Sequence, residues 1–272
     1  MPPDEWGERL PVRCSFAHNY SRELQRALKC GRWCKFHMCE TDAEELVMKI
    51  AVIGVGSVGG TLGRRWAEFG HAVCFGARNV EDADAKALVG KIKGEARLAS
   101  IGDAAKNAVV VVLATPYAAN AAAITAAGDL AGKILIDVTN PIGAGFTLAV
   151  GFSTSGAEEV AKLAPRAKIY KAMNQVGFEV MANPSFAAGK PVMSVAGDDA
   201  AGKTVVLELV SSLGFEAIDA GELAIARLLE PFAMLWIHLM ARRHQGRNFC
   251  VQCAAALSPR ARQPTVTGGK FL

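Results

Sequence analysis

The sequence predicts a doubly wound α/β protein whose sheet is mostly parallel. From residue 49 onward, short strand-like segments alternate with helix-like segments, which is the order of repeated strand–helix–strand units. Most strand-like segments are continuous runs of Val, Ile, Leu and Ala, as expected when helices cover both faces of a sheet. A glycine-rich turn follows the first of these runs and leads into a helical segment.

The elements follow in chain order from this alternation. Eight strands are expected, at residues 49–54, 71–76, 96–100, 108–114, 133–138, 167–172, 191–196 and 215–219. Helices are expected at 58–69, 81–91, 117–128, 156–164, 200–213 and 222–240. We therefore divide the chain into a poorly ordered N-terminal extension (1–47), a first α/β domain (48–165), a small C-terminal α/β portion that ends in an apolar helix (166–240), and a frayed basic tail (241–272).

Gly54, Gly56 and Gly59 form a Gly-x-Gly-x-x-Gly motif directly after the first strand. Gly54 permits a tight turn, Gly56 lets the backbone approach a phosphate group, and Gly59 lets the next helix pack on the strand. The N-terminus of that helix then presents free N–H groups to an anion. Because strand, turn and helix occur in this order, the motif predicts a dinucleotide site on a Rossmann-type fold.

The end of the second strand predicts which dinucleotide binds. Enzymes that use NAD place Asp or Glu there, to bind the ribose 2′-hydroxyl. This chain has Ala77-Arg78-Asn79 instead. A guanidinium can hold a 2′-phosphate through charge-assisted hydrogen bonds, whereas a carboxylate would repel it. The sequence therefore favours NADP(H), the alternative being that Arg78 is only a solvated surface residue.

Two later strands end in polar residues and proline. The run that ends at Ala114 is followed by Thr115-Pro116-Tyr117, and the strand at 133–138 by Thr139-Asn140-Pro141-Ile142. A proline can simply terminate a strand. Ligands of such sheets, however, bind beyond the carboxyl ends of the strands, near the point where the strand order reverses. Together, the two segments predict a nicotinamide pocket.

The last predicted helix is apolar on nearly all sides between Leu223 and Met240. Such a helix must be buried on more than one face, either in the core or in a subunit interface. His238 is the one candidate proton donor that we name, although a histidine within an apolar helix more often has a structural role. No other catalytic residue is assigned.

Composition argues against several other classes of protein. The 272 residues are 51% hydrophobic and 21% charged, as in globular proteins with a sizeable core. The net charge of +4 arises in the tail, which has six Lys or Arg residues and no acid, so a nucleic-acid groove is not expected. No consecutive apolar run approaches the roughly 18 residues that span a bilayer. No secretory leader is recognised at the N-terminus, and we expect a protein of the cytoplasm without a membrane partner.

The cysteines predict neither a metal site nor a redox motif. Cys74, within a predicted strand, is expected to be a small buried hydrophobic residue. The spacing of Cys30, Cys34, His37 and Cys39 matches no common zinc pattern. The Cys250-x-x-Cys253 pair lacks the strand-to-helix setting of a redox motif, so a reducing compartment is expected.

In combination, these motifs resemble those of the NADPH-dependent coenzyme F420 reductase (F420:NADP oxidoreductase-like) family. The resemblance covers about residues 48–240 and includes Lys171-Ala172-Met173-Asn174 and Ala226-Arg227-Leu228-Leu229-Glu230-Pro231. The nucleotide domain of this family is similar to those of pyrroline-5-carboxylate reductases and STEAP-type metalloreductases. The extension 1–47 and the basic tail depart from the family pattern.

The resemblance implies an NADP-dependent oxidoreductase, usually a homodimer, that transfers a hydride between NADP(H) and a small-molecule acceptor of the flavin or deazaflavin type, such as coenzyme F420. It implies pyrophosphate contacts from residues 55, 57 and 58, 2′-phosphate contacts from residues 77 and 78, nicotinamide contacts from the two strand ends, and Asn174 at the border of the acceptor ring. The implied cofactor-binding residues are Gly54, Val55, Gly56, Ser57, Val58, Gly59, Ala77, Arg78, Ala114, Thr115, Pro116, Asn140, Pro141 and Ile142.

Direct hydride transfer requires two rings stacked about 3–3.5 Å apart and little acid–base machinery, which agrees with a sequence that shows no evident catalytic dyad. Two other functions remain open. One is an imine or 3-hydroxyacid reductase on the same fold, although such enzymes continue into a largely helical domain and residues 167–219 still have βαβ character. The other is a non-catalytic NADPH-binding protein.

Overall fold

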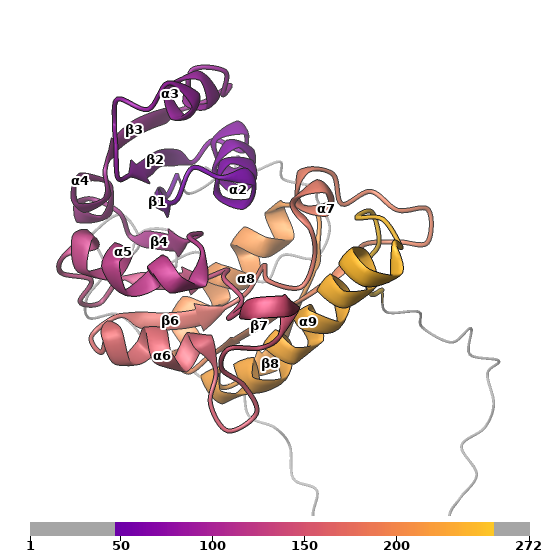
Figure 1. Cartoon of the computed structure of the whole chain (residues 1–272). Helices are drawn as coiled ribbons and strands as arrows, with labels where there is room; N and C mark the ends of the chain where they lie inside the picture. The colour runs from indigo at the N-terminus through magenta and orange to yellow at the C-terminus, as the bar shows by residue number, and fades with distance from the viewer. Residues whose placement is uncertain (1–46, 253–272) are drawn as a thin grey trace, which may run out of the picture. The chain divides into compact units, whose positions relative to one another are not determined.

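One eight-stranded sheet, in the order β3-β2-β1-β4-β5-β6-β7-β8, runs through residues 47–252, which are the residues that the computed structural model describes (Figure 1). The strands are β1 (Lys49–Ile53), β2 (Ala72–Ala77), β3 (Ala96–Ser100), β4 (Val110–Leu113), β5 (Ile134–Asp137), β6 (Lys168–Lys171), β7 (Val192–Gly197) and β8 (Glu216–Gly221). Neighbouring strands are parallel except for β6 and β7, which are antiparallel. The predicted doubly wound, mostly parallel fold is confirmed, and all the predicted strands are present.

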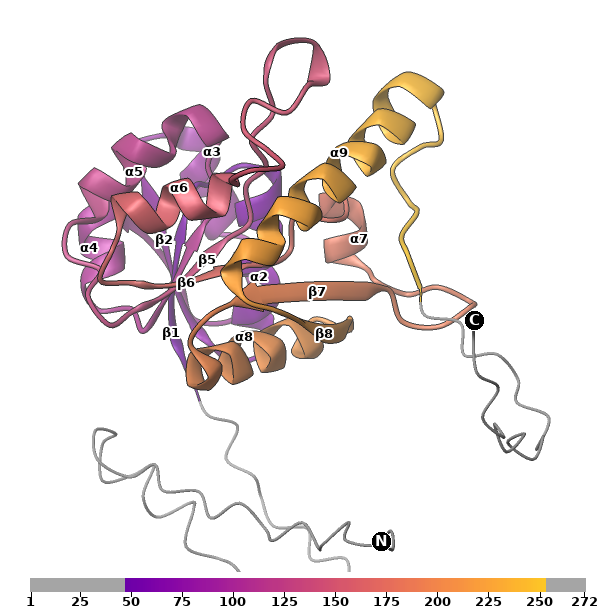
Figure 2. The ribbon, with the colours of Figure 1, turned by 90° about the horizontal axis from the view of Figure 1, so that it is seen from below.

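Helices cover both faces of the sheet (Figure 2). One face packs against α2 (Ser57–Glu68), α3 (Ala83–Val89), α7 (Phe178–Ala182) and α8 (Ala200–Ser212). The other face packs against α4 (Ile101–Lys106), α5 (Asn120–Ala127) and α6 (Gly156–Leu163). Three short 3₁₀ segments and the long last helix complete the described chain: η1 (Tyr117–Ala119), η2 (Ala144–Phe146), η3 (Leu223–Ile225) and α9 (Ala226–Arg243). The sequence did not predict α4 and α7, because six and five residues are too few to show a helical period.

The central strands explain why the apolar runs are continuous. Every residue of β4 and β5 is buried. Along β4, Val110 and Val112 face the core that contains Trp66 of α2, whereas Val111 and Leu113 face the core beneath α4 and α5. Burial on both faces leaves no position for the polar residues that alternate in half-exposed strands.

Strands from both predicted portions of the chain belong to this one sheet. β6 pairs in parallel with β5, and β7 and β8 form a further parallel pair connected through α8. The division predicted between residues 165 and 166 falls in the connection from α6 to β6, inside the continuous sheet. The apolar helix predicted at the end of the C-terminal portion is α9.

Packing contacts continue beyond residue 240, into the first part of the segment that the sequence predicts to be a frayed tail. α9 extends to Arg243, after which the chain turns back along the helix. Trp236 Nε1 donates a hydrogen bond to the carbonyl oxygen of Phe249 at 2.9 Å, and the two rings stack with centroids 5.0 Å apart. The backbone N–H of Val192 in β7 donates to the carbonyl oxygen of Val251 at 2.9 Å. These contacts hold Phe249 and Val251 in place. The predictions made for residues 1–46 and 253–272, including those for the cysteines in these segments, lie outside the described residues.

The helical segment Leu223–Arg243 is long and apolar enough to cross a membrane by length and composition, with 21 residues and a mean hydropathy of 1.5. A count of consecutive apolar residues missed it because Arg227 and Glu230 interrupt the run. The core helix of a globular protein passes the same test, and 44% of this apolar window is buried inside the protein. Length and composition alone are therefore weak evidence for a membrane span.

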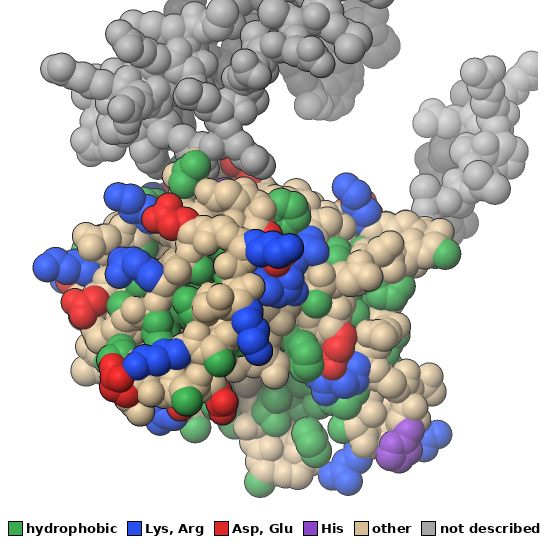
Figure 3. Space-filling model, turned by 90° about the horizontal axis from the view of Figure 1, so that it is seen from above, with side chains coloured by type: hydrophobic (Ala, Val, Ile, Leu, Met, Phe, Trp, Pro, Cys, Tyr) green, Lys and Arg blue, Asp and Glu red, His purple; other side chains and the backbone are tan. Residues whose placement is uncertain are grey.

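Charges of both signs are distributed over the described surface. Several form ion pairs at 2.9 Å, among them Arg64 with Glu68 and Arg166 with Asp129. On the face shown in Figure 3, basic and acidic side chains are interspersed and separated by uncharged surface. Exposed pairs of this kind contribute little to stability, typically about 0–1 kcal/mol each.

Candidate functional site

The glycine turn lies between β1 and α2, where the strand order reverses between β1 and β4. Gly54 has a φ of 109°, and a Cβ atom there would lie 2.5 Å from the carbonyl oxygen of Ala114. A Cβ atom on Gly59 would lie 2.0 Å from the carbonyl oxygen of Gly54. No side chain fits at either position. Around Gly56, by contrast, nothing lies within 4 Å of the Cβ position, so this part of the turn faces open space.

The N-terminus of α2 is suited to bind an anion. Gly56 is the N-cap residue and forms no side-chain capping bond, and the first turn contains no acidic residue. The N–H groups of the first turn therefore lack side-chain partners, and the dipole of this 12-residue helix adds a partial positive charge. A phosphate group next to Gly56 would satisfy these groups.

A cavity of about 900 Å³ opens beside the turn. Its volume lies within the range of pockets that hold small molecules and cofactors. The predicted residues that line it are Gly54, Val55, Gly56, Ala77, Arg78, Ala114, Thr115 and Pro116. The lining does not include Ser57, Val58 and Gly59, which belong to the first turn of α2, nor Asn140, Pro141 and Ile142.

Twelve of the twenty residues that line the cavity were not predicted from the sequence. The additional lining residues are Ile53, Gly76, Asn79, Asp82, Asp84, Ala85, Leu88, Ile101, Ala119, Ala122, Ala123 and Ala126. Most of them come from α3 and from the segment that contains η1 and α5, which carry no recognisable motif. The alanines at 119, 122, 123 and 126 recur at helical spacing, and this could have indicated a helix face that a ligand approaches closely.

Arg78 lies just beyond β2, and among the described residues it is the only cationic one in the lining of this cavity. Its side chain is exposed, and it forms no hydrogen bond or ion pair with the described residues. Asp82 and Asp84 line the same cavity. The Asp82 carboxylate accepts a hydrogen bond from the backbone N–H of Ala85 at 2.8 Å and so caps α3. The guanidinium is therefore available to an anionic ligand.

The two predicted nicotinamide segments are linked by hydrogen bonds. Thr115 Oγ1 donates to Asn120 Oδ1 at 2.7 Å, and Asn120 Nδ2 donates to Thr139 Oγ1 at 3.1 Å. Thr115 and Pro116 line the cavity, whereas residues 140–142 do not. The structure thus brings both strand ends together, and the first contributes directly to the cavity wall.

Asn174 connects the segment after β6 to the segment after β5. Asn140 Nδ2 donates to the carbonyl oxygen of Asn174 at 2.9 Å, and Asn174 Nδ2 donates to Asn140 Oδ1 at 3.0 Å. Gln175 Nε2 donates to Asn174 Oδ1 at 3.1 Å. The Asn174 residue is only 5% exposed, so its amide holds the two segments together. His238 is exposed on α9 and does not line the cavity. A substrate contact for Asn174 and a proton-donor role for His238 stay predictions.

Burial raises the pKa of two side chains, those of Tyr117 in η1 and Cys74 in β2. Burial, with smaller contributions from Glu159, Glu230 and Asp137, raises the pKa of Tyr117, so its phenol is neutral at physiological pH. Burial also raises the pKa of the Cys74 thiol, which keeps it protonated and unreactive.

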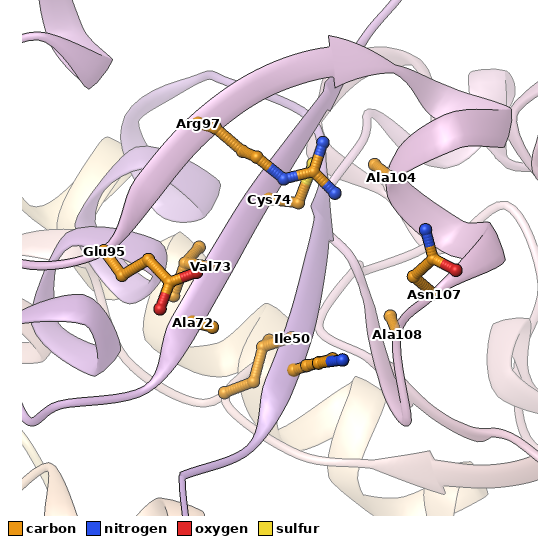
Figure 4. A pocket seen from close by; sticks show the side chains of 10 residues that line it. Ile50, Ala72, Val73, Cys74, Glu95, Arg97, Ala104, Asn107 and Ala108 are labelled. Atoms are coloured by element: carbon orange, nitrogen blue, oxygen red, sulfur yellow. The ribbon is translucent and has the colours of Figure 1, made fainter.

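Cys74 belongs to a second, smaller hollow of about 180 Å³, where its side chain lies next to that of Arg97 (Figure 4). Lys49 and Ala72, which also line it, are the first residues of β1 and β2. The hollow therefore lies at the amino ends of the strands, opposite to the edge where parallel α/β sheets bind ligands. Among residues 47–252, no group of three or more His, Cys, Asp or Glu side chains could hold a metal ion.

The sheet order, the glycine turn and the cavity define a Rossmann-type dinucleotide-binding protein. The family model described as NADP oxidoreductase, coenzyme F420-dependent, matches residues 49–141. A crystal structure from Arthrobacter sp. FB24, described provisionally as that of an F420-dependent NADP-reductase, is similar to this chain with a TM-score of 0.70. The two sequences are 35% identical, and the match covers 76% of this chain and 100% of that chain. The chain therefore belongs to the family of F420-dependent NADP oxidoreductases, as its motifs predicted.

Two curated relatives are similar at lower identity. The F420-dependent NADP reductase of Methanocaldococcus jannaschii is 29% identical over 211 residues, which are 71% of this chain and 92% of that protein. Metalloreductase STEAP3 of Rattus norvegicus is 29% identical over 187 residues, which are 68% of this chain. The chain spans only 36% of the length of the latter protein. Membership in a family of NADP-dependent oxidoreductases confirms the coarser part of the predicted function.

Proposed function

We propose that this protein is an NADPH-dependent reductase that transfers a hydride between NADP(H) and an acceptor of the flavin or deazaflavin type, such as coenzyme F420. The observation that carries the proposal is that one cavity is lined both by the glycine turn at Gly56 and by Arg78, whose guanidinium has no partner within residues 47–252. The relatives named for F420-dependent NADP reduction support the acceptor class.

The residues at the cavity fit NADPH. The space beside Gly56 leaves room for the pyrophosphate, and the free N–H groups of α2 complement its charge. Arg78 supplies a cation for the 2′-phosphate, which NADH lacks. The lining residues Thr115 and Pro116 then mark the wall at the end of β4, where we place the nicotinamide.

The cofactor, when bound, supplies a hydride, and the role of the protein is to orient and shield it. The described residues that line the cavity are largely apolar and include no His, Lys or Cys. This composition supports direct transfer between two stacked rings, which depends on position more than on acid–base groups. The strands β6–β8 belong to the main sheet, which favours this activity over that of the imine and 3-hydroxyacid reductases with their helical second domain.

We further propose that α9 forms a homodimer interface. Leu228, Phe232 and Leu235 are 66%, 38% and 55% exposed, and their spacing of four and three residues places them along one stripe of the helix. A second copy of the chain could cover this stripe and remove it from water. Leu235→Glu should then shift the protein to a monomer in light scattering coupled to size-exclusion chromatography, and an unchanged dimer would refute this interface.

Besides a second copy, the proposed partner is a small-molecule acceptor, without nucleic acid or a membrane. We also propose a cytoplasmic location. The described cysteines, Cys74 and Cys250, are free thiols, and free thiols persist in a reducing compartment.

A panel of acceptors tests the proposed activity. NADPH consumption would be measured with coenzyme F420, FMN, FAD, a quinone, a ferric chelate, pyrroline-5-carboxylate and a 3-oxoacid. We expect turnover with the deazaflavin or the flavins. Turnover of pyrroline-5-carboxylate or the oxoacid alone would instead assign an imine or hydroxyacid reductase. Tight NADPH binding without oxidation by any acceptor would assign a non-catalytic binding protein.

A further inference from the structure

Three charged side chains meet at the carboxyl ends of β5 and β6 with no exposure to solvent. Asp137 and Lys171 are the last residues of these strands, and Glu230 reaches them from α9. Lys171 Nζ lies 2.9 Å from Asp137 Oδ2 and 2.8 Å from Glu230 Oε1, and all three side chains are 0% exposed. Burial by itself lowers the pKa of Lys171, but the carboxylates of Asp137 and Glu230 outweigh it and hold this pKa above its ordinary value. Lys171 is therefore charged and ties the three elements together.

Glu230 also caps a helix on another part of the chain. Its two carboxylate oxygens accept hydrogen bonds from the backbone N–H groups of Gly156 at 2.8 Å and of Ala157 at 3.1 Å. These are the first N–H groups of α6, where the helix dipole is positive. One lysine cannot neutralise two carboxylates, and the N-terminus of α6 offsets the remaining negative charge. Removal of one partner from such a buried cluster leaves an uncompensated charge.

The cluster extends to the two segments that the sequence predicts to contact the nicotinamide, after β4 and after β5. Lys171 Nζ donates to the carbonyl oxygen of Thr139 at 2.5 Å. Asp137 Oδ1 accepts hydrogen bonds from the backbone N–H of Thr139 at 2.9 Å and from its hydroxyl at 2.7 Å. Through Asn120, the Thr139 hydroxyl is connected to Thr115 in the cavity wall.

Packing at the start of α6 reaches the same segments. A Cβ atom on Gly156 would lie 3.2 Å from Glu230 Oε1, 3.2 Å from a ring carbon of Tyr117 and 3.4 Å from Pro141 Cδ. Tyr117 and Pro141 thus meet Glu230 around one glycine. The glycine turn and Arg78, which would bind the pyrophosphate and the 2′-phosphate, take no part in these contacts.

We propose that Glu230 is a positioning residue for the nicotinamide half of the site. It acts through Lys171 and the start of α6 on residues 115–117 and 139–141, and it does not act on the half that holds the adenosine phosphates. This inference rests on the proposed function, which places the nicotinamide at the end of β4, the first of these two segments. It also means that α9, which carries the proposed dimer stripe, is connected to the reacting end of the cofactor.

The test separates the two halves of the cofactor with two ligands. Adenosine 2′,5′-bisphosphate occupies the adenosine half alone, whereas NADP⁺ occupies both, and calorimetry gives the dissociation constant of each. For Glu230→Gln, we expect an unchanged constant for adenosine 2′,5′-bisphosphate and one about tenfold weaker for NADP⁺, since a charged hydrogen-bond partner is lost behind the nicotinamide segments. The rate of hydride transfer should fall by roughly 10- to 100-fold because the nicotinamide is misplaced.

Two further variants keep the result decisive. Glu222→Gln removes an exposed acid just before η3 and should match the wild type with both ligands. Thr139→Val keeps the shape of the side chain and removes only the hydroxyl between Asp137 and Asn120. It should weaken the binding of NADP⁺ and leave that of adenosine 2′,5′-bisphosphate unchanged. This variant provides the test if Glu230→Gln does not fold. Equal weakening of both ligands in a folded variant, or of neither, would overturn the inference.

The outcome for the wild type distinguishes this inference from the proposed function. Suppose that the wild type reduces no acceptor, but that Glu230→Gln weakens the binding of NADP⁺ and not that of adenosine 2′,5′-bisphosphate. The positioning role then stands and the proposed activity fails. Suppose instead that the wild type binds NADP⁺ and adenosine 2′,5′-bisphosphate with equal dissociation constants, and that Glu230→Gln changes neither constant. The positioning role then fails, whether or not the enzyme reduces an acceptor.

Discussion

Replacement of Arg78 by alanine tests the cofactor assignment most directly. The guanidinium lines the cavity and has no partner among the described residues, so its removal breaks no contact of the fold. Hydrogen bonds to charged groups contribute about 1.5–3 kcal/mol. Because Arg78 is exposed, solvent screening places its contribution near the lower end of that range, at about 1.5 kcal/mol. At about 1.4 kcal/mol per decade, Arg78→Ala should weaken NADPH binding roughly tenfold.

The assay is a titration of the fluorescence of NADPH and of NADH with wild type and variant. NADH has no 2′-phosphate, so its affinity should be nearly unchanged, and the preference for NADPH should fall by the same factor. Arg97→Ala is a matched control, because Arg97 is an exposed arginine at the opposite edge of the sheet (Figure 4). Equal losses for both dinucleotides, or no loss for NADPH, would refute the reasoning.

The remaining predictions concern the glycine turn and the response to acid. Gly59→Ala would place a Cβ atom 2.0 Å from the carbonyl oxygen of Gly54 and should lower the free energy of unfolding by about 1–3 kcal/mol or more, measured in urea. A Cβ atom at Gly56 would meet no atom within 4 Å, so the free energy of unfolding of Gly56→Ala should stay within about 0.5 kcal/mol of the wild-type value while NADPH binding weakens. A destabilised Gly56→Ala protein would contradict the open space at this turn. The hydrogen bond from Arg227 is the main cause that lowers the pKa of Glu158 below its ordinary value of 4.5. The folded protein thus binds this proton less readily than the unfolded chain, and the contribution of Glu158 is complete above pH 4.5 and lost as the pH falls further. Urea unfolding of Glu158→Gln should show a deficit near neutral pH that shrinks in acid, and a deficit independent of pH would argue against the ion pair.

The half of the site that the sequence predicted is the half whose residues are neighbours along the chain. Gly54, Gly56 and Gly59 lie within six residues, and steric limits on the turn leave little choice of residue at two of them. Arg78 follows directly from the end of β2. The continuous apolar runs predicted the buried strands, because burial on both faces of a parallel sheet removes polar positions.

The features that depend on residues far apart in sequence were decided by the tertiary structure alone. Asp137, Lys171 and Glu230 are 34 and 59 residues apart, and no local period indicates that they form one buried cluster. The sequence also showed no sign of the cavity wall from α3 and α5, of the antiparallel pairing of β7 with β6, or of the contacts of Phe249 with Trp236 and of Val251 with β7. Local spacing encodes turns, strands and helix ends, because their energies depend on adjacent residues. Charge pairing and cavity walls depend on which elements pack together, and that is settled only when the whole sheet has formed.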